Sequence, residues 1–435
     1  ADPSVILASD GKYYAYPTGG NKFKVYSSTD LIHWRDEGVA LSNSDVSWAK
    51  TNFWAPEVLE RNGKYYMYFS AGADVMHISV AVSDKPTGPF KEVLDQPLIN
   101  FEYGTIDPYV FIDDDGKIYM YYSKNMAPVE NRKESHIYVV ELGEDMMSLK
   151  GEPVLVSKPE QSWELKSGNK RWNEGSFVLK KDGTYYLMYS ANCYCGRSYS
   201  VGYSTSKSPF GPFTKYWNNP VLSAEYSKVS GTGHHSIVRS PDGRELFIVY
   251  HSHINPAEGG GNRQLNIDRM GFREDGSIYV NGPTLTDQPP PSGVNGWTNI
   301  AGEAKITAGS VKEGYSVKAL QDGEIGIYPT RTETRDWVVA RESDKAWVKL
   351  EWDEPREVDS IWIYNSARYQ RALQTGTVVM SDGTKEHVEF PKGEPGAAAI
   401  VRPSGKKLKW IRFEVGETLV SGSDAGLSEI FVLGK

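Results

Sequence analysis

One pattern of strand, tight turn and strand occurs five times between Ala1 and Ser252, and it constrains the fold more than any other feature of the chain. The clearest copy is WNEGSFVLKKDGTYYLMYS, which begins at Trp172. Asp-Gly or Asn-Gly between apolar and aromatic runs predicts a β-hairpin, because glycine accepts the positive φ that such turns need. The five turn glycines are Gly11, Gly63, Gly116, Gly183 and Gly243. Each copy therefore predicts the start of a small antiparallel sheet.

The spacing of these glycines predicts how the sheets are arranged. Successive turn glycines are 52, 53, 67 and 60 residues apart. A repeat of roughly fifty residues built from four strands is typical of a β-propeller blade, and a closed ring of blades protects the sheet edges. No stretch shows the capped helical periodicity that an α/β fold needs. We therefore predict a five-bladed β-propeller over residues 1–282.

The remainder of the chain has a different pattern. Residues 283–296 are rich in Pro and Gly, which predicts a linker that lies on the surface. Residues 297–435 contain short alternating strands, such as VDSIWIYNS and LKWIRFEVG, and lack the blade repeat. Short alternating strands separated by turns are typical of a β-sandwich. The sequence thus predicts an all-β chain of two domains.

Three carboxylates occupy one position of the repeat. Counting nine residues back from each turn glycine gives Asp2, Trp54, Asp107, Glu174 and His234. In a radial arrangement equivalent positions meet at a common axis. A single aspartate before proline can have a purely structural role in extended segments and turns. Three carboxylates crowded at one axis are different, because their repulsion raises the pKa of at least one of them, so that one group is protonated while another is charged. A charged base beside a protonated acid is what cleavage of a glycosidic bond requires.

Composition excludes some classes of partner. The net charge is −8 and no block is rich in Lys or Arg, which argues against nucleic acid. No run of eighteen apolar residues exists that could form a membrane-spanning helix. The 27 Tyr and 12 Trp suit both strand packing and stacking on sugar rings. Cys193 and Cys195 are two residues apart in a strand-like stretch, where the geometry is unfavourable for a disulfide bond. We therefore expect free thiols. Two cysteines do not indicate whether the protein works in an oxidising or a reducing compartment.

The motifs DP at the start, AP-E, IDP, NEG and GHHS, in that order, resemble glycoside hydrolase family 43 from Ala1 to about Gly282. Members of that family are five-bladed propellers that invert configuration at the anomeric carbon, and most release L-arabinofuranose or D-xylose from plant polysaccharides. The resemblance implies that Asp2 is the general base and Glu174 the general acid, with Asp107 orienting the acid and tuning its pKa. No cofactor is required for this chemistry. The family usually has residues ahead of the opening Asp-Pro that anchor the base, so we expect the numbering to begin after trimming.

Further site residues follow from the repeat and from the resemblance. Trp54, with Phe53 beside it, and Trp172 are candidates for the walls of a sugar pocket, with core packing as the alternative. The resemblance implies that His234 lies at the centre of the ring, near or on a metal ion, and a structural histidine is the alternative. It also implies that Arg263 bonds the sugar or the site carboxylates, whereas an ordinary surface ion pair is the alternative.

The second domain resembles the discoidin or factor V/VIII C-domain type, a galactose-binding-like jelly roll that includes carbohydrate-binding module family 32. The segments that carry this resemblance are KALQDGEIG, WVKLEWDEPREVDSIWIY and the closing GLSEIFVLG. It implies a structural calcium ion between Asp322 and Glu429, and a turn aspartate with a solvated glutamate is the alternative. Three aromatic residues are candidates for exposed sugar-binding loops: Tyr328, Trp337 and Tyr369. The alternative, that this domain only packs against the propeller and binds no sugar, is equally plausible.

The function expected from these features is an exo-acting α-L-arabinofuranosidase that acts on plant cell-wall glycans. A β-D-xylosidase is the runner-up, and a non-catalytic carbohydrate-binding protein is the alternative from a different class. The loops Glu160–Arg171 and Asn255–Asn262 are expected to set the depth of the pocket and so the choice of sugar. We expect a carbohydrate partner, no nucleic acid or membrane partner, and a secreted or periplasmic enzyme, with a cytoplasmic one left open.

Overall fold

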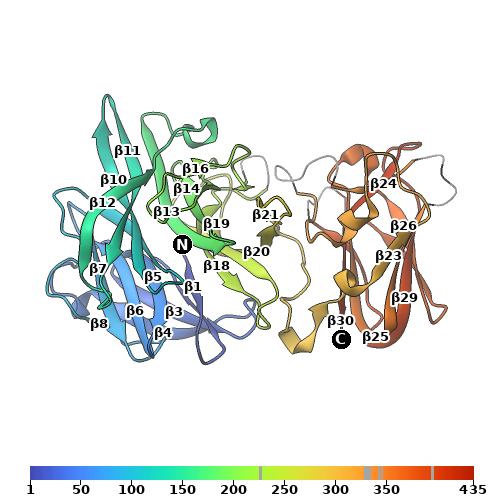
Figure 1. Cartoon of the computed structure of the whole chain (residues 1–435), viewed down its shortest axis with the longest axis horizontal. Coiled ribbons are helices and arrows are strands. Elements are labelled where there is room, and N and C mark those ends of the chain that lie inside the picture. The colour runs from blue at the N-terminus through green and yellow to red at the C-terminus, as the bar shows by residue number, and fades with distance from the viewer. Residues whose placement is uncertain (225–227, 328–334, 341–342, 344–345, 393–395) are drawn as a thin grey trace. The chain divides into compact units, whose positions relative to one another are not determined.

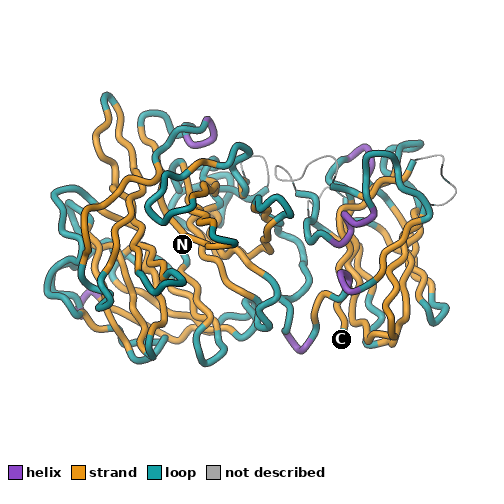
Figure 2. The backbone as a smooth tube through the Cα atoms, in the orientation of Figure 1, coloured by secondary structure: helices purple, strands orange, loops and turns teal. Residues whose placement is uncertain are grey.

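The computed structural model describes residues 1–224, 228–327, 335–340, 343, 346–392 and 396–435. Its regular structure consists of β-strands, with short 3₁₀ turns as the only helical elements in those ranges. The chain divides into two compact units, one of Ala1–Val238 with Phe247–Ile267 and the other of Arg239–Leu246 with Asp268–Lys435. The all-β prediction is confirmed (Figures 1 and 2).

Two four-stranded antiparallel sheets come first in the chain. The first sheet contains β1 (Ser4–Leu7), β2 (Tyr13–Tyr16), β3 (Lys22–Ser28) and β4 (Arg35–Ser42), and a 3₁₀ turn, η1 (Asn43–Asp45), follows it. The second sheet contains β5 (Trp54–Arg61), β6 (Lys64–Ala71), β7 (His77–Ser83) and β8 (Lys91–Glu92). In both sheets the strands lie in chain order, as the predicted blades require.

The third and fourth blades are hydrogen-bonded to each other. The third has β9 (Thr105–Ile112), β10 (Ile118–Val129), β11 (Arg132–Leu142) and β12 (Leu149–Ser157), followed by η2 (Ser162–Glu164). The fourth has β13 (Lys170–Lys181), β14 (Thr184–Ala191), β15 (Ser200–Ser206), β16 (Thr214–Lys215) and β17 (Leu222–Ser223). Parallel pairing of β11 with the start of β13 joins them into one nine-stranded sheet.

The fifth blade contains β18 (Gly233–Arg239), β19 (Leu246–His253), β20 (Arg263–Phe272) and β21 (Ile278–Val280), again in chain order. Its strands complete the five predicted groups. The turn glycines of the five hairpins, Gly11, Gly63, Gly116, Gly183 and Gly243, have φ of 81°, 73°, 83°, 69° and 74°. These left-handed turns are the conformation that the Asp-Gly and Asn-Gly pairs predicted.

A second left-handed residue occurs within or next to the innermost strand of each blade. These residues and their φ values are Asp2 (46°), Ala55 (43°), Asp107 (55°), Gly175 (57°) and His234 (46°). The pairing register shifts near this point in β5 and in β13. A β-bulge of this kind bends the strand and re-aims the local side chains. Each blade therefore turns its chain sharply where the candidate site residues lie.

Aromatic side chains form the core between the first two blades. Phe53 is fully buried, and its ring stacks on Phe69 with centroids 5.6 Å apart. Phe23 and Trp48 contact the same Phe69 ring at 5.8 and 6.1 Å. The expectation that Phe53 lines a sugar pocket is therefore wrong, because core packing leaves none of this side chain exposed.

Replacing Phe69 by Ala is expected to destabilise this unit by about 3–5 kcal/mol, the usual cost of removing a buried aromatic ring. Phe69 is 1% exposed and contacts three aromatic rings, so the cavity would have few means to close. Equilibrium unfolding in denaturant measures the change. Trp217, which is 81% exposed, supplies the control: Trp217→Ala should change stability by no more than about 0.5 kcal/mol. Equal effects of the two substitutions would contradict this account of the core.

The segment expected to form a surface linker is instead packed. Between β21 and β22 (Thr298–Asn299) its only regular element is η3 (Val294–Gly296). Thr284 Oγ1 donates to Asp268 Oδ1 at 2.5 Å, and Ser292 Oγ donates to Asp242 Oδ2 at 2.5 Å. Both Thr284 and Ser292 are buried. The prolines and small polar residues here serve as anchors within the second unit, so the surface-linker prediction is wrong.

The second unit has two layers of strands over one core. From Thr298 onward its elements are β22, η4 (Ala301–Glu303), β23 (Lys305–Ala308), η5 (Val317–Gln321), β24 (Trp337–Val339), β25 (Trp347–Asn365), η6 (Tyr369–Arg371), β26 (Thr375–Met380), β27 (Lys385–Glu389), β28 (Ala398–Val401), β29 (Lys406–Val415) and β30 (Ala425–Gly434). The first half of β25 pairs with β23 and β29, and its second half pairs with β28 and β30. One apolar cluster includes side chains from both halves, among them Val348, Leu350, Ile361 and Ile363.

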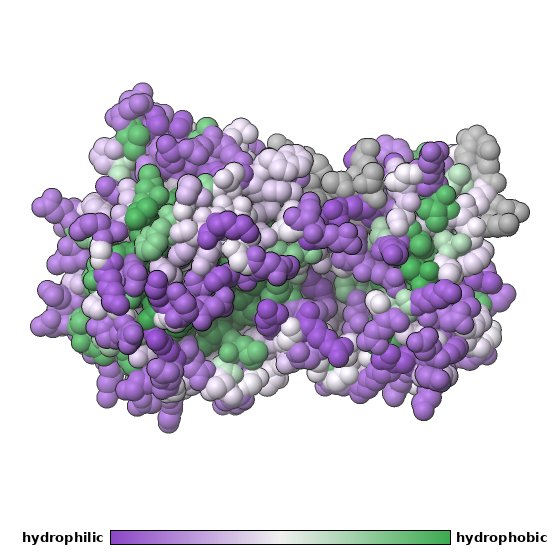
Figure 3. Space-filling model, in the orientation of Figure 1, coloured by the Kyte–Doolittle hydropathy of each residue, from purple (hydrophilic) through white to green (hydrophobic). Residues whose placement is uncertain are grey.

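No helix in the described ranges is long and apolar enough to cross a membrane. Hydrophilic side chains dominate the face of both units shown in Figure 3, with smaller apolar patches among them.

Candidate active site

Asp2 is held by contacts from the first and fifth blades. Arg263 Nη1 donates to Asp2 Oδ1 at 2.7 Å, and Thr18 Oγ1 donates to Asp2 Oδ2 at 2.6 Å. Thr18 also donates its backbone N–H to the Ala1 carbonyl at 3.0 Å, and its hydroxyl accepts the N–H of Ala55 at 2.8 Å. The Asp2 side chain is only 11% exposed, so these contacts fix its position.

Two histidines lie against the same carboxylate. The Nδ1 atoms of His234 and His251 are 3.4 and 3.3 Å from Asp2 Oδ1. The Asp2 backbone N–H donates to His251 Nδ1 at 3.2 Å. Burial alone would raise the pKa of Asp2, but the charges of His234 and Arg263 outweigh it and hold this pKa well below its usual range. Asp2 is therefore ionised at neutral pH.

Asp107 lies next to the start of β13. Its Oδ2 accepts the backbone N–H of Gly175 at 3.2 Å, and its own N–H donates to Ser70 Oγ at 3.0 Å. Burial and the charge of Asp2 raise the pKa of Asp107 to about 6, against the opposing charge of His234. Asp107 is therefore mostly ionised at neutral pH, with a backbone donor on its anion.

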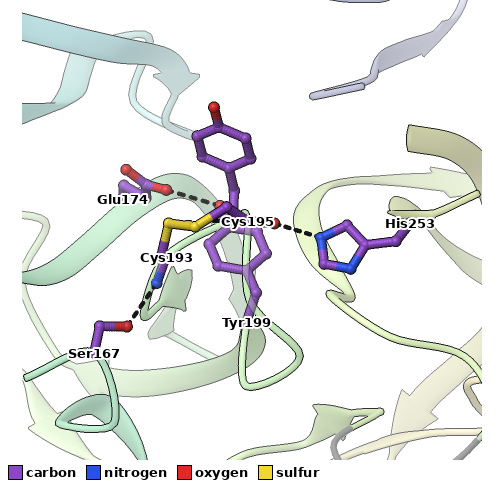
Figure 4. The surroundings of a disulfide bond; sticks show 7 residues. Ser167, Glu174, Cys193, Cys195, Tyr199 and His253 are labelled. Carbon is purple, nitrogen blue, oxygen red and sulfur yellow. Dashed lines mark hydrogen bonds between the residues drawn. A yellow bond between two sulfur atoms is a disulfide. The ribbon is translucent and has the colours of Figure 1, made fainter. Parts of the chain in front are cut away.

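Glu174 is the residue just before Gly175, and its carboxyl group is 6% exposed. Tyr199 donates its hydroxyl to Glu174 Oε1 at 2.9 Å (Figure 4). Burial, followed by the neighbouring charge of Asp107, raises the pKa of Glu174 well above its usual range. Burial and the Asp107 charge therefore both favour the protonated form of this carboxyl group.

Asp2 and Glu174 are connected through His251 and Tyr199. The ring of His251, which accepts from the Asp2 backbone, stacks on the ring of Tyr199 with centroids 5.5 Å apart and planes at 6°. Tyr199 in turn bonds Glu174. The site thus holds two buried carboxyl groups whose pKa values are shifted in opposite directions, an arrangement that suits general acid–base catalysis.

Comparison with known proteins identifies the family. The model described as "Glycosyl hydrolases family 43" matches residues 1–278. The chain belongs to glycoside hydrolase family 43. Family 43 enzymes are propellers that act with inversion of configuration, so the predicted fold and enzyme class are confirmed. The non-catalytic alternative is not supported.

Relatives within family 43 differ in their described activities. The chain is 35% identical to "Beta-D-galactofuranosidase xynD" of Aspergillus niger, over 66% of this chain and 83% of that protein. It is 33% identical to "Xylosidase/arabinosidase" of Bacteroides ovatus, over 64% and 94% respectively. A solved structure described as a thermostable family-43 glycoside hydrolase is 43% identical with a TM-score of 0.65, over 67% of this chain and 95% of that chain.

The second unit has a different family match. Residues 299–433 match a domain of unknown function, DUF7402. The resemblance to the discoidin type therefore stays a prediction. Trp337 is fully buried and donates Nε1 to the Ser310 carbonyl, so the expectation of an exposed loop aromatic is wrong for this residue. Tyr369 is 65% exposed, and Tyr328 lies outside the described residues.

The remaining residues predicted for the family 43 site lie as follows. Trp54 is 36% exposed at the start of β5, and Trp172 is half-buried and pairs with Ser135 of β11. Arg263 contacts a site carboxylate rather than a surface acid. His234 faces Asp2, and its N–H donates to Ser190 Oγ at 2.8 Å.

Sequence reasoning missed three residues of this site. Thr18 follows the first blade's repeat and has no distinguishing motif. His251 ends the fifth repeat as part of VYHS, and its place in the repeat was the available signal. Tyr199 lies in the loop after β14, where nothing in the sequence marks it as a partner of Glu174.

The two cysteines form a disulfide bond, so the free-thiol prediction is wrong. Cys193 and Cys195 have Cα atoms 5.1 Å apart. The stretch is a loop between β14 and β15, and a loop brings the two side chains together in a way that an extended strand does not. The bond lies near Tyr199 and Glu174 (Figure 4).

Glu429 contacts the residue next to Asp322 in the second unit, where a calcium ion was predicted. Glu429 Oε2 accepts the N–H of Gly323 at 2.6 Å, and its Oε1 accepts the N–H of Ile430 at 2.9 Å. Within the described ranges no group of three or more His, Cys, Asp and Glu side chains could hold a metal ion, and this includes His234. Calcium takes six to eight oxygen ligands, so these two carboxylates supply at most part of such a site.

Proposed function

We propose that the chain is an exo-acting α-L-arabinofuranosidase that removes terminal arabinofuranose from plant cell-wall polysaccharides or their fragments. Its chemistry is supported by two buried carboxyl groups with opposite pKa shifts, because the pKa of Asp2 is held low while that of Glu174 is raised. The sugar is supported by relatives whose descriptions name an arabinosidase and a galactofuranosidase, because both names denote release of a sugar that can take the five-membered furanose form.

In the proposed reaction Asp2 is the general base and Glu174 the general acid. A carboxylate oxygen of Asp2 takes a proton from water, and the water oxygen bonds to the anomeric carbon from the face opposite the leaving group. The bond from that carbon to the leaving oxygen breaks as Glu174 gives that oxygen its proton. We expect the two carboxyl groups to stand roughly 6.5–9.5 Å apart, which leaves room for the water. Asp107 keeps Glu174 protonated through the repulsion of its negative charge.

Exo action is supported by two loops that are hydrogen-bonded to each other close to Arg263, the residue that contacts Asp2. The loop after β14 and the loop after β19 are joined by a hydrogen bond from the Gly260 N–H to the Cys195 carbonyl at 3.0 Å. The second of these is the predicted specificity loop Asn255–Asn262. Two loops fixed to each other would close one end of a substrate groove and leave room for a terminal sugar.

A substrate screen tests the proposal and its alternatives. The panel contains aryl α-L-arabinofuranosides, β-D-xylosides and β-D-galactofuranosides, followed by release assays on arabinan and arabinoxylan. We expect the arabinofuranoside to be cleaved fastest, with inversion seen by NMR. The description of one relative as a xylosidase makes β-D-xylosidase the second candidate. A faster rate on the xyloside or galactofuranoside would reassign the sugar, and inactivity on all of them would overturn the proposal.

The pH profile offers a test of the role of Asp107. Activity needs Asp2 ionised and Glu174 protonated, so kcat/KM should fall at alkaline pH as Glu174 loses its proton. The groups that act on Glu174 are Asp107, Tyr199, Asp2 and Arg263. Asp107→Asn removes a negative charge that raises the pKa of Glu174, so we expect the alkaline limb to move to lower pH. An unchanged or higher alkaline limb in this variant would contradict the assigned role.

The second unit is proposed to be a galactose-binding-like jelly roll that contacts glycan and holds a structural calcium ion near Asp322 and Glu429. If calcium binds there, adding it to chelator-treated protein should raise the melting temperature of this unit. Asp322→Asn should abolish the increase, because it removes a carboxylate ligand. Magnesium at equal concentration is the control. If calcium did not raise the melting temperature of the unaltered chain, the calcium proposal would be wrong.

We further propose a secreted or periplasmic location. The disulfide of Cys193 and Cys195 supports it, because such bonds persist in oxidising compartments and are rare in the cytoplasm of most organisms. Some relatives are described as extracellular. Fractionation of the native source with an antibody would decide the point, and enzyme confined to the cytoplasm would contradict it.

A further inference from the structure

The loop closed by the disulfide carries an aromatic residue that covers the arginine of the active site. Tyr194 lies between Cys193 and Cys195 and is 43% exposed. The carbon at the centre of the Arg263 guanidinium is 4.5 Å from the centroid of the Tyr194 ring. Arg263 Nη1 donates to Asp2 Oδ1 at 2.7 Å. The guanidinium group thus contacts an aromatic ring and the Asp2 carboxylate at the same time.

This loop is fixed at each of its three residues. The Cys193 N–H donates to Ser167 Oγ at 2.9 Å, and the Tyr194 carbonyl accepts from His253 Nε2 at 2.7 Å (Figure 4). The Cys195 carbonyl accepts the N–H of Gly260 at 3.0 Å. The disulfide adds a covalent restraint across the residue that bears the ring.

The partners of the loop are themselves rigid. His253 is 1% exposed, and its Nδ1 lies 2.7 Å from Ser230 Oγ. Gly259 has φ of 64°, and a side chain there would place its Cβ 2.6 Å from the Cys195 carbonyl oxygen. The close approach of the two loops therefore depends on a glycine at this position.

Arg263 has few other means of holding its position. Among the residues that the structure describes, its one other side-chain hydrogen bond runs from Nε to the Gly261 carbonyl at 3.4 Å, which is long. The side chain is 9% exposed, so much of its cover comes from neighbouring groups such as the Tyr194 ring. A cation over an aromatic face is attracted to it, and an arginine stacks with its plane on the ring.

We propose that Tyr194, held by the Cys193–Cys195 disulfide, is a positioning residue for Arg263 and, through Arg263, for the carboxylate of Asp2. The proposal rests on the proposed role of Asp2 as general base. The ring acts by restricting where the guanidinium group can lie, and its hydroxyl group has no part in this role. No redox step is needed, because the disulfide serves only as a restraint on the loop.

The proposal predicts a particular change in the pH profile. The positive charge of Arg263 favours the ionised forms of Asp2, Asp107 and Glu174, against burial and the mutual repulsion of the three carboxyl groups. If the guanidinium group moves away, the pKa values of both base and acid rise. The acid limb and the alkaline limb of kcat/KM should then both move to higher pH.

The test compares Tyr194→Leu with Tyr194→Phe on the best aryl glycoside. Tyr194→Leu should lower kcat/KM by about 3- to 30-fold, the range that corresponds to loss of a cation–π contact, and should move both limbs to higher pH. Tyr194→Phe keeps the ring and should match the unaltered enzyme in both respects. Trp217→Leu, at another exposed aromatic residue, controls for general surface effects. A rise in KM with both limbs unchanged would overturn the proposal, because it would place Tyr194 against the substrate.

The disulfide is tested separately by the Cys193→Ser/Cys195→Ser double variant, which leaves the tyrosine in place. It should show the same upward shift of both limbs, smaller than that of Tyr194→Leu. A double variant with an unaltered profile would remove the disulfide from the proposal.

A readout that does not depend on hydrolysis separates this proposal from the assigned activity. Phenylglyoxal modifies exposed arginines, and peptide mapping by mass spectrometry reports the rate at Arg263. The rate should rise in Tyr194→Leu and in the double cysteine variant, and stay low in Tyr194→Phe. Should the unaltered enzyme cleave no glycoside of the panel, the proposed function fails while this measurement still decides the role of the loop. Equal rates in all variants would overturn the positioning role.

Discussion

Asp2→Asn is expected to lower kcat/KM by about 10²- to 10⁴-fold, the usual contribution of a general base, for every glycoside the enzyme cleaves. The amide keeps the size of the side chain, and its single oxygen can accept one of the two hydrogen bonds that Arg263 and Thr18 donate to separate oxygens of the carboxylate. It has no negative charge with which to take a proton from water. The loss should therefore be the same for good and poor leaving groups, because the attacking water is activated in both cases.

The control for this prediction is an aspartate of the third blade's turn. Asp115 Oδ1 accepts the N–H of Lys117 at 3.0 Å on the surface, and Asp115→Asn preserves the Asn-Gly type of turn. Its kcat/KM should match that of the unaltered enzyme. Circular dichroism and melting curves confirm that both variants fold. An Asp2→Asn enzyme with more than about a tenth of normal activity would rule out the assigned general base.

Glu174→Gln is expected to have an effect that depends on the leaving group. For arabino-oligosaccharides, whose leaving alcohol needs a proton, kcat/KM should fall by about 10²- to 10⁴-fold. For an activated aryl glycoside such as a dinitrophenyl derivative, the leaving group departs as an anion and the loss should be small. The alkaline limb of the pH profile should also disappear, because it reports loss of the Glu174 proton.

The matched control is Glu144→Gln, an exposed glutamate of the turn after β11. It should leave both substrates unaffected. The measurement is a plot of log kcat/KM against the pKa of the leaving group for a series of aryl glycosides. The slope should be steeper for Glu174→Gln than for the unaltered enzyme. Equal losses on all leaving groups would argue that Glu174 is needed for binding or for stability, and would exclude it as the acid.

Much of the propeller could be predicted from the turn residues. Gly11, Gly63 and their equivalents have the positive φ that Asp-Gly and Asn-Gly pairs indicate, so the hairpins and their number followed from local chemistry. The position nine residues before each glycine also led to Asp2, Asp107 and Glu174, since blade geometry repeats even where side chains differ. Their catalytic roles stay predictions until the variants are measured.

Other parts of the site could not be predicted because they depend on tertiary contacts. Tyr199 and Thr18 meet Glu174 and Asp2 only through loops whose paths the repeat does not determine. The disulfide required a loop conformation where the sequence suggested a strand. Phe53 was predicted to line the sugar pocket together with Trp54, but Trp54 is exposed while Phe53 faces the core. Adjacent residues of a strand face opposite sides.

The left-handed residues at the starts of the innermost strands bear on how this enzyme can be engineered. A residue other than glycine costs about 1–3 kcal/mol in such a conformation, and Asp2, Asp107 and His234 all adopt it. Variants selected for heat resistance alone would gain from glycine at these positions and lose the side chains of the candidate active site. Ala55 has the same φ without a charged or hydrogen-bonding side chain. It is therefore the position of this set at which relief of strain and retention of catalysis are compatible.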